Sequence, residues 1–269
     1  MSAPVAPEGI YVVEHGPAEA EPPLVVMVHG TMDRSASFAR AARRLPDLRV
    51  ITYDRRGYGR SSASLTGIGS LATHVEDLVD ILDGRRAAVV GHSFGGDVAL
   101  ALAFGRPDLV AAVGAYEPPM PWIEWWPAGG ASLDIRHRGL EDPEQVAEHF
   151  LRNVAGDEVW ESLPEATKSR RRAEGGAVLA DITALTGGAT PFTVAELRAI
   201  VNSGVPVRLG SGSRSKPHQR DGTTRLGVEI GVPVTVLDDA RHGGHSSHPD
   251  AFAQWVREIV TAARRRGAS

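Results

Sequence analysis

The 269-residue chain has a formal net charge of −4 and 42% hydrophobic residues, values that suit a globular protein and give no sign of a basic nucleic-acid-binding surface. It contains no cysteine, which excludes disulfides, thiolate metal ligands and a cysteine nucleophile. Residues 1–9 lack the basic start and apolar stretch of a signal peptide. No apolar run approaches the roughly 20 residues that cross a bilayer. We therefore expect a cytoplasmic protein with neither nucleic acid nor a membrane as partner.

Apolar runs that end in loops containing glycine or proline predict a mostly parallel central sheet. The first is Leu24–Val28, which follows two prolines and ends at His29-Gly30. An unbroken apolar run of this length is typical of a strand buried on both faces. Further strands are expected at 49–53, 87–90, 110–116, 205–209 and 232–237, with a possible edge strand at 10–14.

Helical patterns alternate with these strands. Residues 71–82 are the clearest case, because their apolar positions recur at helical spacing. Alternating strands and helices predict an α/β fold with helices on both faces of the sheet. The helices expected between and after the strands span 35–44, 71–82, 94–104 and 252–263.

Residues 118–204 interrupt the alternation, because they show helical but no strand patterns. A helical insertion at the end of a strand predicts a lid over a site at the carboxyl edge of the sheet. We thus assign 1–117 and 205–269 to the core and 118–204 to a helical lid insertion. Trp122, Trp125 and Trp126 open the insertion and are expected to form lid core or a wall of an apolar substrate pocket. Short helices are expected at 143–154, 157–162, 165–173, 176–185 and 193–201.

The segment Gly91-His92-Ser93-Phe94-Gly95-Gly96 has the form Gly-x-Ser-x-Gly between a buried strand and an amphipathic helix. A nucleophile at the tip of such a turn has a strained backbone and needs small neighbours, which Gly91 and Gly95 provide. The helix that begins at Phe94 directs backbone N–H groups and a positive dipole end at the site. The pattern therefore predicts Ser93 as a nucleophile.

Four motifs follow one another in the order seen in the α/β-hydrolase superfamily, and the chain resembles that family over nearly its whole length. The resemblance implies a Ser-His-acid enzyme with a helical lid, a small-molecule substrate and no cofactor or metal. The motifs are an oxyanion loop at His29-Gly30-Thr31, an Asp-x-x-Gly-x-Gly-x-Ser loop at 54–62, the nucleophile turn at 91–96, and His242 followed by His248-Pro249.

The resemblance also assigns an oxyanion hole. In this fold its two N–H donors come from the residue after the nucleophile and from the loop after the first core strand, here Phe94 and Thr31. Two backbone N–H groups aimed at the substrate oxygen stabilise the charge that develops when the carbonyl is attacked.

His242 is expected to be the general base, because it is the first histidine after the last strand. His245 is expected to face the lid or solvent, and His248 to enter the last helix. An alternative makes His242, His245 and His248 metal ligands, but no acidic or thiolate partner is evident in the sequence. His29 and His92 are expected to shape the site.

The acid of the triad departs from the family pattern. Ser213 stands where an aspartate is expected, and a serine cannot carry the charge that stabilises imidazolium. Glu117, at the end of the preceding core strand, is the preferred replacement because its longer side chain helps to cross one strand spacing. Asp239, Asp221 and an unsupported Ser–His pair remain alternatives. Asp54 is expected to hold its own glycine-rich loop.

These expectations describe an esterase-like serine hydrolase. Ser93 would form an acyl-enzyme, with His242 as base and then acid, and water would release the product. The same fold also supports lyases, cofactor-free haloperoxidases and acyltransferases. A catalytically inactive small-molecule receptor is a further alternative, which the serine at position 213 favours. The oligomeric state is not indicated by the sequence.

Overall fold

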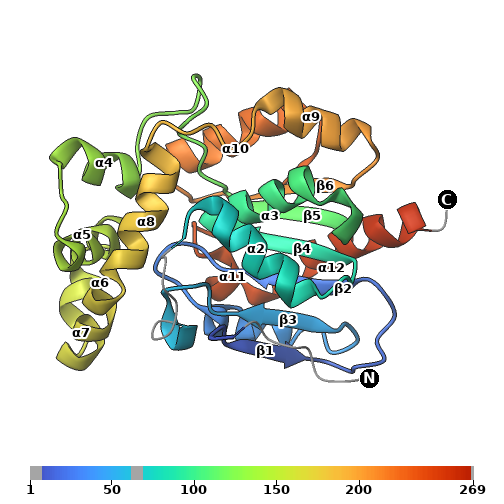
Figure 1. The fold of residues 1–269 in the computed structure, drawn as a ribbon, viewed down its shortest axis with the longest axis horizontal. Coiled ribbons are helices and arrows are strands. Elements are labelled where there is room, and N and C mark those ends of the chain that lie inside the picture. Colours follow the sequence, from blue (N-terminus) through green and yellow to red (C-terminus); the bar gives the residue numbers. More distant parts are fainter. Residues whose placement is uncertain (1–7, 62–68, 268–269) are drawn as a thin grey trace.

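The structure is a computed structural model that describes residues 8–61 and 69–267 (Figure 1). Its described residues form a seven-stranded sheet of order β1-β3-β2-β4-β5-β6-β7. Every neighbouring pair is parallel except β1 and β3. The strands are β1 (Val12–His15), β2 (Leu24–Val28), β3 (Val50–Tyr53), β4 (Ala87–His92), β5 (Val110–Tyr116), β6 (Val207–Gly212) and β7 (Val234–Leu237).

Helices cover both faces of this sheet, because alternate side chains of each buried strand point to opposite sides. In β4, Ala87 and Val89 join one hydrophobic cluster, whereas Ala88 and Val90 join the other. The first cluster includes residues of α2 (Leu71–Leu82), α3 (Phe94–Gly105), α9 (Val194–Asn202) and α10 (Pro217–Ile230). The second includes residues of α1 (Ala39–Ala42) and α12 (Pro249–Gly267), and α11 (Gly244–Ser247) contacts both of these helices.

Five further helices form a group beside the sheet, at the left of Figure 1. Three of them supply a third hydrophobic cluster that includes Ile135, Val146 and Val178 and also takes in Met32 and Tyr58 from the core. The other two pack against helices among these three. In the part of the chain that the structure describes, no helix is both long and apolar enough to span a membrane. The group consists of α4 (Ala131–Arg138), α5 (Pro143–Ala155), α6 (Asp157–Ser162), α7 (Glu165–Ala173) and α8 (Gly175–Thr186).

The predicted fold class is confirmed, and the expected strands and helices are present with boundaries within a few residues. Two long helices were not predicted, α4 and α10. In α10, Gly222 and Gly227 weaken the helical pattern. Both glycines have a packing reason, because a Cβ at Gly222 would lie 2.8 Å from the Trp126 ring and one at Gly227 would lie 2.5 Å from Val234. Residues 35–44, expected as one helix, form a 3₁₀ turn over 35–38 followed by the four-residue α1.

The start of α3 lies against the ends of the two central strands. A Cβ at Gly95 would lie 2.1 Å from the carbonyl oxygen of Val28, and one at Gly91 would lie 2.0 Å from the carbonyl oxygen of Gly95. No side chain fits in either place. The two glycines of the motif therefore allow helix and strands to approach to backbone contact.

The close contact between α3 and the strands predicts that alanine substitution has different effects on stability at two glycines of α3. We expect Gly95→Ala to lower the free energy of unfolding by about 1–3 kcal/mol or more, because backbone atoms must move to admit the methyl group. Gly105→Ala is the matched control, since nothing lies within 4 Å of the added Cβ. Urea denaturation of both variants measures the difference, and equal stabilities would contradict the close approach.

Candidate active site

Ser93 occupies a strained turn between β4 and α3. Its backbone has φ 53° and ψ −129°, a region that residues with side chains rarely adopt. Its N–H donates to the Tyr116 carbonyl at 2.8 Å, which ties the turn to the end of β5. A strained serine at the carboxyl end of a central strand, followed at once by a helix, is the geometry of an exposed nucleophile.

Glu117 and His242 form a hydrogen-bonded pair beside this turn. Glu117 follows β5, and its Oε2 accepts from Nδ1 of His242 at 2.7 Å. Its other oxygen, Oε1, accepts from the Ser211 hydroxyl and from the Gly212 N–H, both at 2.8 Å. The Glu117 side chain thus begins at the end of β5 and passes the end of β6, and its carboxylate reaches the loop after β7. The structure therefore brings together the preferred acid and the preferred base.

The environment of Glu117 keeps it charged. Burial raises the pKa of this carboxyl, but the hydrogen bond and charge of His242 and the N–H of Gly212 lower it more, so the net pKa lies below its ordinary value. The backbone at Glu117 has φ 47°, which is strained for a residue with a side chain. Strain of this kind persists only where the surrounding structure fixes it.

The alternative acids make other contacts. Asp239 pairs with Arg214 at 2.9 Å, and Asp221 lies 3.4 Å from Arg220. Ser213 Oγ accepts from the Asp239 N–H at 2.8 Å and so closes the loop after β7.

Ser93, Glu117, His242 and Thr31 line one cavity of about 80 Å³. A neighbouring cavity of about 140 Å³ shares His242 and is also lined by Arg214, Lys216 and Arg241. Further walls of the first cavity come from α4, α5, α8 and α10, namely Ala131, Leu133, Phe150, Val154, Leu185 and His218.

Only one of the three tryptophans lines this cavity. Trp126 does so, and it stacks on Trp125, with 5.7 Å between the ring centroids. Trp125 lies under the guanidinium of Arg225. Trp122 donates from Nε1 to the Phe192 carbonyl and packs edge-on against that ring. The expectation of a pocket wall thus applies to Trp126, whereas Trp122 and Trp125 pack at the base of the insertion.

The two residues assigned to the oxyanion hole lie on either side of Ser93. Phe94 is the first residue of α3, and N–H groups in a first helical turn have no partner within the helix. The loop that carries Thr31 passes close to the nucleophile, because a Cβ at Gly30 would lie 2.9 Å from Ser93 Cβ. The Thr31 side chain itself points elsewhere and donates to Asp181 at 2.8 Å.

Asp181, a fully buried residue of α8, was not predicted from the sequence as part of the site. Its carboxylate accepts from the Arg55 guanidinium at 2.7 and 3.1 Å, from the Tyr58 hydroxyl at 2.8 Å and from Thr31. Burial raises the pKa of Asp181, but the charge of Arg55 and hydrogen bonds bring it well below its ordinary value. This pair anchors the group of five helices to the loop that carries Thr31. Its only sequence signal was one aspartate in an otherwise apolar helical segment.

Asp54 and His29 have the supporting roles expected of them. Asp54 accepts from the N–H groups of Ser35 and Arg60, at 2.8 and 2.9 Å, and so holds its own loop. His29 is buried and accepts from the Arg55 N–H at 2.7 Å. Burial and the nearby Arg55 charge lower the pKa of His29 to about 4, so its ring is neutral at pH 7.

The expectation that His245 faces the lid or solvent is wrong. The ring is 3% exposed, packs against Phe38 and Phe252, and lies 3.1 Å from the Asp33 carboxylate. The sequence places Asp33 more than 200 positions away, so no local pattern could show this contact. His248 bonds to the neighbouring Ser247 hydroxyl and enters the last helix, as expected.

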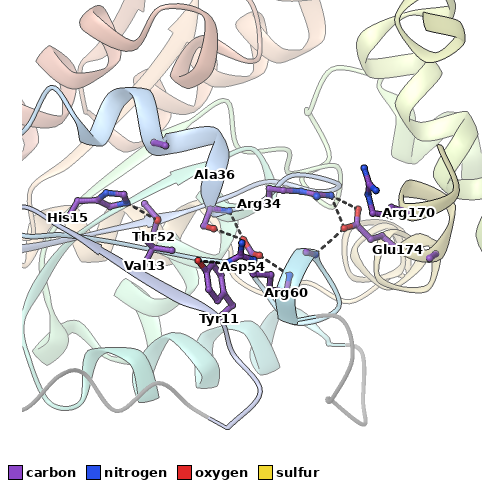
Figure 2. A pocket seen from close by; sticks show the side chains of 14 residues that line it. Tyr11, Val13, His15, Arg34, Ala36, Thr52, Asp54, Arg60, Arg170 and Glu174 are labelled. Carbon is purple, nitrogen blue, oxygen red and sulfur yellow. Dashed lines mark hydrogen bonds and ion pairs between the residues drawn. The ribbon is translucent and has the colours of Figure 1, made fainter. Parts of the chain in front are cut away.

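Of three cavities lined by described residues, the largest lies away from Ser93, along β1, β3 and the start of α1 (Figure 2). It measures about 780 Å³. The buried charged groups in its walls already have protein partners, since Asp54 accepts from Ser35 and Arg60, and Glu174 accepts from Arg34. None of the residues assigned to catalysis lines it, so the smaller cavity at Ser93 is the candidate active site.

Comparison with known proteins agrees with this architecture. Residues 23–138 match a family model described as alpha/beta hydrolase fold. The chain has the α/β-hydrolase fold. A thermophilic esterase from Thermogutta terrifontis superposes with a TM-score of 0.71 at 20% identity, over 94% of this chain and 93% of that one.

Curated relatives of this α/β-hydrolase-fold chain carry different activities in their names. Lipase LipV of Mycobacterium tuberculosis is 35% identical over 112 residues, which are 40% of this chain and 41% of the lipase. The 2-succinyl-6-hydroxy-2,4-cyclohexadiene-1-carboxylate synthase of Serratia proteamaculans is 24% identical over 90% of this chain and 94% of its own length. The chain thus spans less than half of the lipase, and these similarities support an enzyme of this fold without defining its reaction.

Removing the charge of Asp181 tests the buried anchor. We expect Asp181→Asn to lower the free energy of unfolding at pH 7 by about 3–5 kcal/mol, because the Arg55 charge stays buried without compensation. The folded-state pKa of Asp181 lies below its unfolded value. The difference in the free energy of unfolding between the wild type and Asp181→Asn is therefore fully present above about pH 5. It shrinks as the pH falls below about 4.

Urea unfolding of both proteins at several pH values measures this difference. Asp47→Asn is the control, because Asp47 forms a similar two-contact pair with Arg257 but is 57% exposed, and exposed pairs add little stability. Equal losses in the two variants would contradict the proposed anchor.

Proposed function

We propose that the protein is a serine hydrolase acting on small esters or similar acyl compounds. The hydrogen bond between Glu117 and His242, beside a strained serine in the same cavity, carries this proposal. A histidine whose Nδ1–H is held by a buried carboxylate presents Nε2 as the proton acceptor, which is the arrangement that a serine nucleophile requires.

In the proposed reaction, His242 takes the hydroxyl proton of Ser93 as the oxygen attacks the substrate carbonyl. The N–H groups of Thr31 and Phe94 stabilise the oxyanion. His242 then gives the proton to the leaving group, and an acyl-enzyme forms. Water attacks the acyl-enzyme with His242 again acting as base, and Glu117 stabilises the imidazolium in both steps.

The cavity limits the substrate. Its volume of about 80 Å³ is well below the roughly 300–1,000 Å³ of typical ligand sites. We propose that a short apolar acyl group occupies it, and that larger substrates require helices of the α4–α8 group to move away as a lid. The apolar side chains of Phe150, Val154 and Leu185 on these helices support an apolar acyl group.

The chain's similarity to the synthase over most of its length favours a second candidate, a synthase or lyase reaction at the same site. Both candidates use Ser93 and His242. A screen of purified protein against short-chain p-nitrophenyl esters separates them, because turnover with acyl-enzyme formation supports the hydrolase and its absence favours the other reaction.

The nucleophile can be tested directly. We expect Ser93→Ala to lower ester turnover by at least about a thousandfold while the fold is retained. A fluorophosphonate probe should label the wild type at Ser93 and leave the variant unlabelled, as mass spectrometry of the peptide will show. Activity near that of the wild type in Ser93→Ala would remove the assignment.

The displaced acid is tested by Glu117→Gln, which preserves shape but cannot offset the imidazolium charge. We expect kcat to fall by about a hundredfold or more. Ser213→Ala is the matched control at the usual position of the acid, and it should have a mild effect. If Ser213→Ala instead reduces kcat as much as Glu117→Gln does, the assignment of the acid to Glu117 is wrong.

A further inference from the structure

Asp33, His92 and His245 converge beside the candidate active site without a role in the proposed reaction. Asp33 Oδ2 lies 3.1 Å from His245 Nε2 and 3.9 Å from His92 Nδ1. All three donor atoms lie within 4.8 Å of one another. The two rings are almost fully buried, while the Asp33 side chain is 23% exposed. The cluster is therefore enclosed on the protein side and open to solvent at the carboxylate.

The protonation of His92 leaves an unpaired acceptor in this cluster. Its Nε2 lies 2.9 Å from the His242 carbonyl oxygen, and a carbonyl only accepts, so Nε2 carries the proton. Nδ1 then carries a lone pair, which is buried and has no hydrogen-bond partner among the residues that the structure describes.

This lone pair faces the Asp33 carboxylate, which is also an acceptor. Two acceptors that face each other at 3.9 Å make no hydrogen bond. A cation between them would satisfy both.

We propose that Asp33, His92 and His245 bind a divalent transition-metal ion of the Zn²⁺ class. Two imidazoles and one carboxylate form a common ligand set for such ions. Ligand atoms about 2.0–2.1 Å from a tetrahedral ion are about 3.4 Å apart. Asp33 and His92 must therefore approach by roughly half an ångström, and the two histidine nitrogens, which lie within 4.8 Å of each other, must reach the same separation. His245 must also exchange its hydrogen bond for coordination. Water completes the coordination on the exposed side of Asp33.

Contacts around His92 and Asp33 match those of metal sites, whereas Nδ1 of His245 is buried and has no hydrogen-bond partner in the described part of the chain. A ligating histidine usually donates its other N–H to a carbonyl or carboxylate, as His92 does to the carbonyl of His242. The Asp33 carboxylate is oriented by two local donors, the Arg34 N–H at 2.9 Å and the Ser37 hydroxyl at 2.9 Å. His92 and Asp33 would therefore be held in place before the ion arrives.

The proposed ion would join the three loops that carry the candidate catalytic groups. Asp33 lies two residues after Thr31, His92 directly precedes Ser93, and His245 lies three residues after His242. A single ion would thus fix the oxyanion loop, the nucleophile turn and the histidine loop relative to one another. We assign it a structural role, since none of its ligands belongs to the proposed triad.

Titration of the metal-free protein with Zn²⁺ by isothermal calorimetry tests the site, and a melting curve at each concentration reports stabilisation. We expect one Zn²⁺ per chain and a rise in melting temperature of a few degrees, because an ion that binds only the folded state stabilises it. Asp33→Asn and His245→Gln should each weaken Zn²⁺ binding at least tenfold. Substituting Co²⁺ should give a visible ligand-field absorption that both variants lose.

Two controls exclude other histidines. His149→Gln removes a histidine paired with one carboxylate, Asp134, outside the cluster. His218→Gln removes the histidine that lines the cavity beside His242. Both controls should bind Zn²⁺ like the wild type. Unchanged binding in Asp33→Asn and His245→Gln, loss of binding in His218→Gln, or no saturable binding by the wild type would each overturn the proposal.

A zinc-edge anomalous map of wild-type crystals soaked in Zn²⁺ gives a test that does not depend on the folding of variants. A peak between Asp33, His92 and His245 supports the site. Peaks only elsewhere, with Asp33 and His245 still hydrogen-bonded, would show that the cluster is a metal-free contact between loops. Binding is measured without substrate, so its failure leaves the proposed hydrolase activity untouched.

Discussion

The candidate site depends on the backbone contact between α3 and the central strands. Because Gly91 and Gly95 have no side chains, the first turn of α3 reaches the carbonyl of Val28 and leaves Ser93 at the tip of a sharp turn. The strain at Ser93 is local, but its consequences extend over the site. The turn places the N–H of Phe94 at the start of a helix, where the macrodipole favours negative charge.

The position of Glu117 follows from the order of the strands. Ser93 follows β4, Glu117 follows β5 and the loop of His242 follows β7, so the acid must reach past the end of β6. It can do so because β6 ends in Ser211 and Gly212, which donate two hydrogen bonds to the carboxylate on its way. A Cβ at Gly212 would lie 2.3 Å from the Ala240 carbonyl, so the ends of β6 and the histidine loop are also in close contact. The contact between Glu117 and His242 therefore depends on the length of the glutamate side chain and on the small, polar residues that end β6.

The sequence predicted those parts of the molecule that local patterns encode. The buried strands and the amphipathic helices appear where periodicity placed them, and α2 begins and ends as expected. Helix α10 was missed because its glycines serve contacts with Trp126 and Val234, which are visible only in three dimensions. The roles of Asp181 and His245 were missed for the same reason, since their partners lie more than 100 positions away in the chain.

The Arg55–Asp181 pair explains how the added helices are attached to this site. Helix α8 contributes its only buried charge to a network that ends on the hydroxyl of Thr31, so displacement of α8 would break a fully buried ion pair. Such a pair adds little net stability to the fold, because desolvation offsets much of the attraction between its charges. Its main effect is to favour one position of α8 over others. If the site opens as proposed, movement of α4 and α5 around a fixed α8 would therefore break fewer buried polar contacts than displacement of α8. It would leave the proposed oxyanion loop in place while Phe150 and Val154, on α5, move away from the cavity.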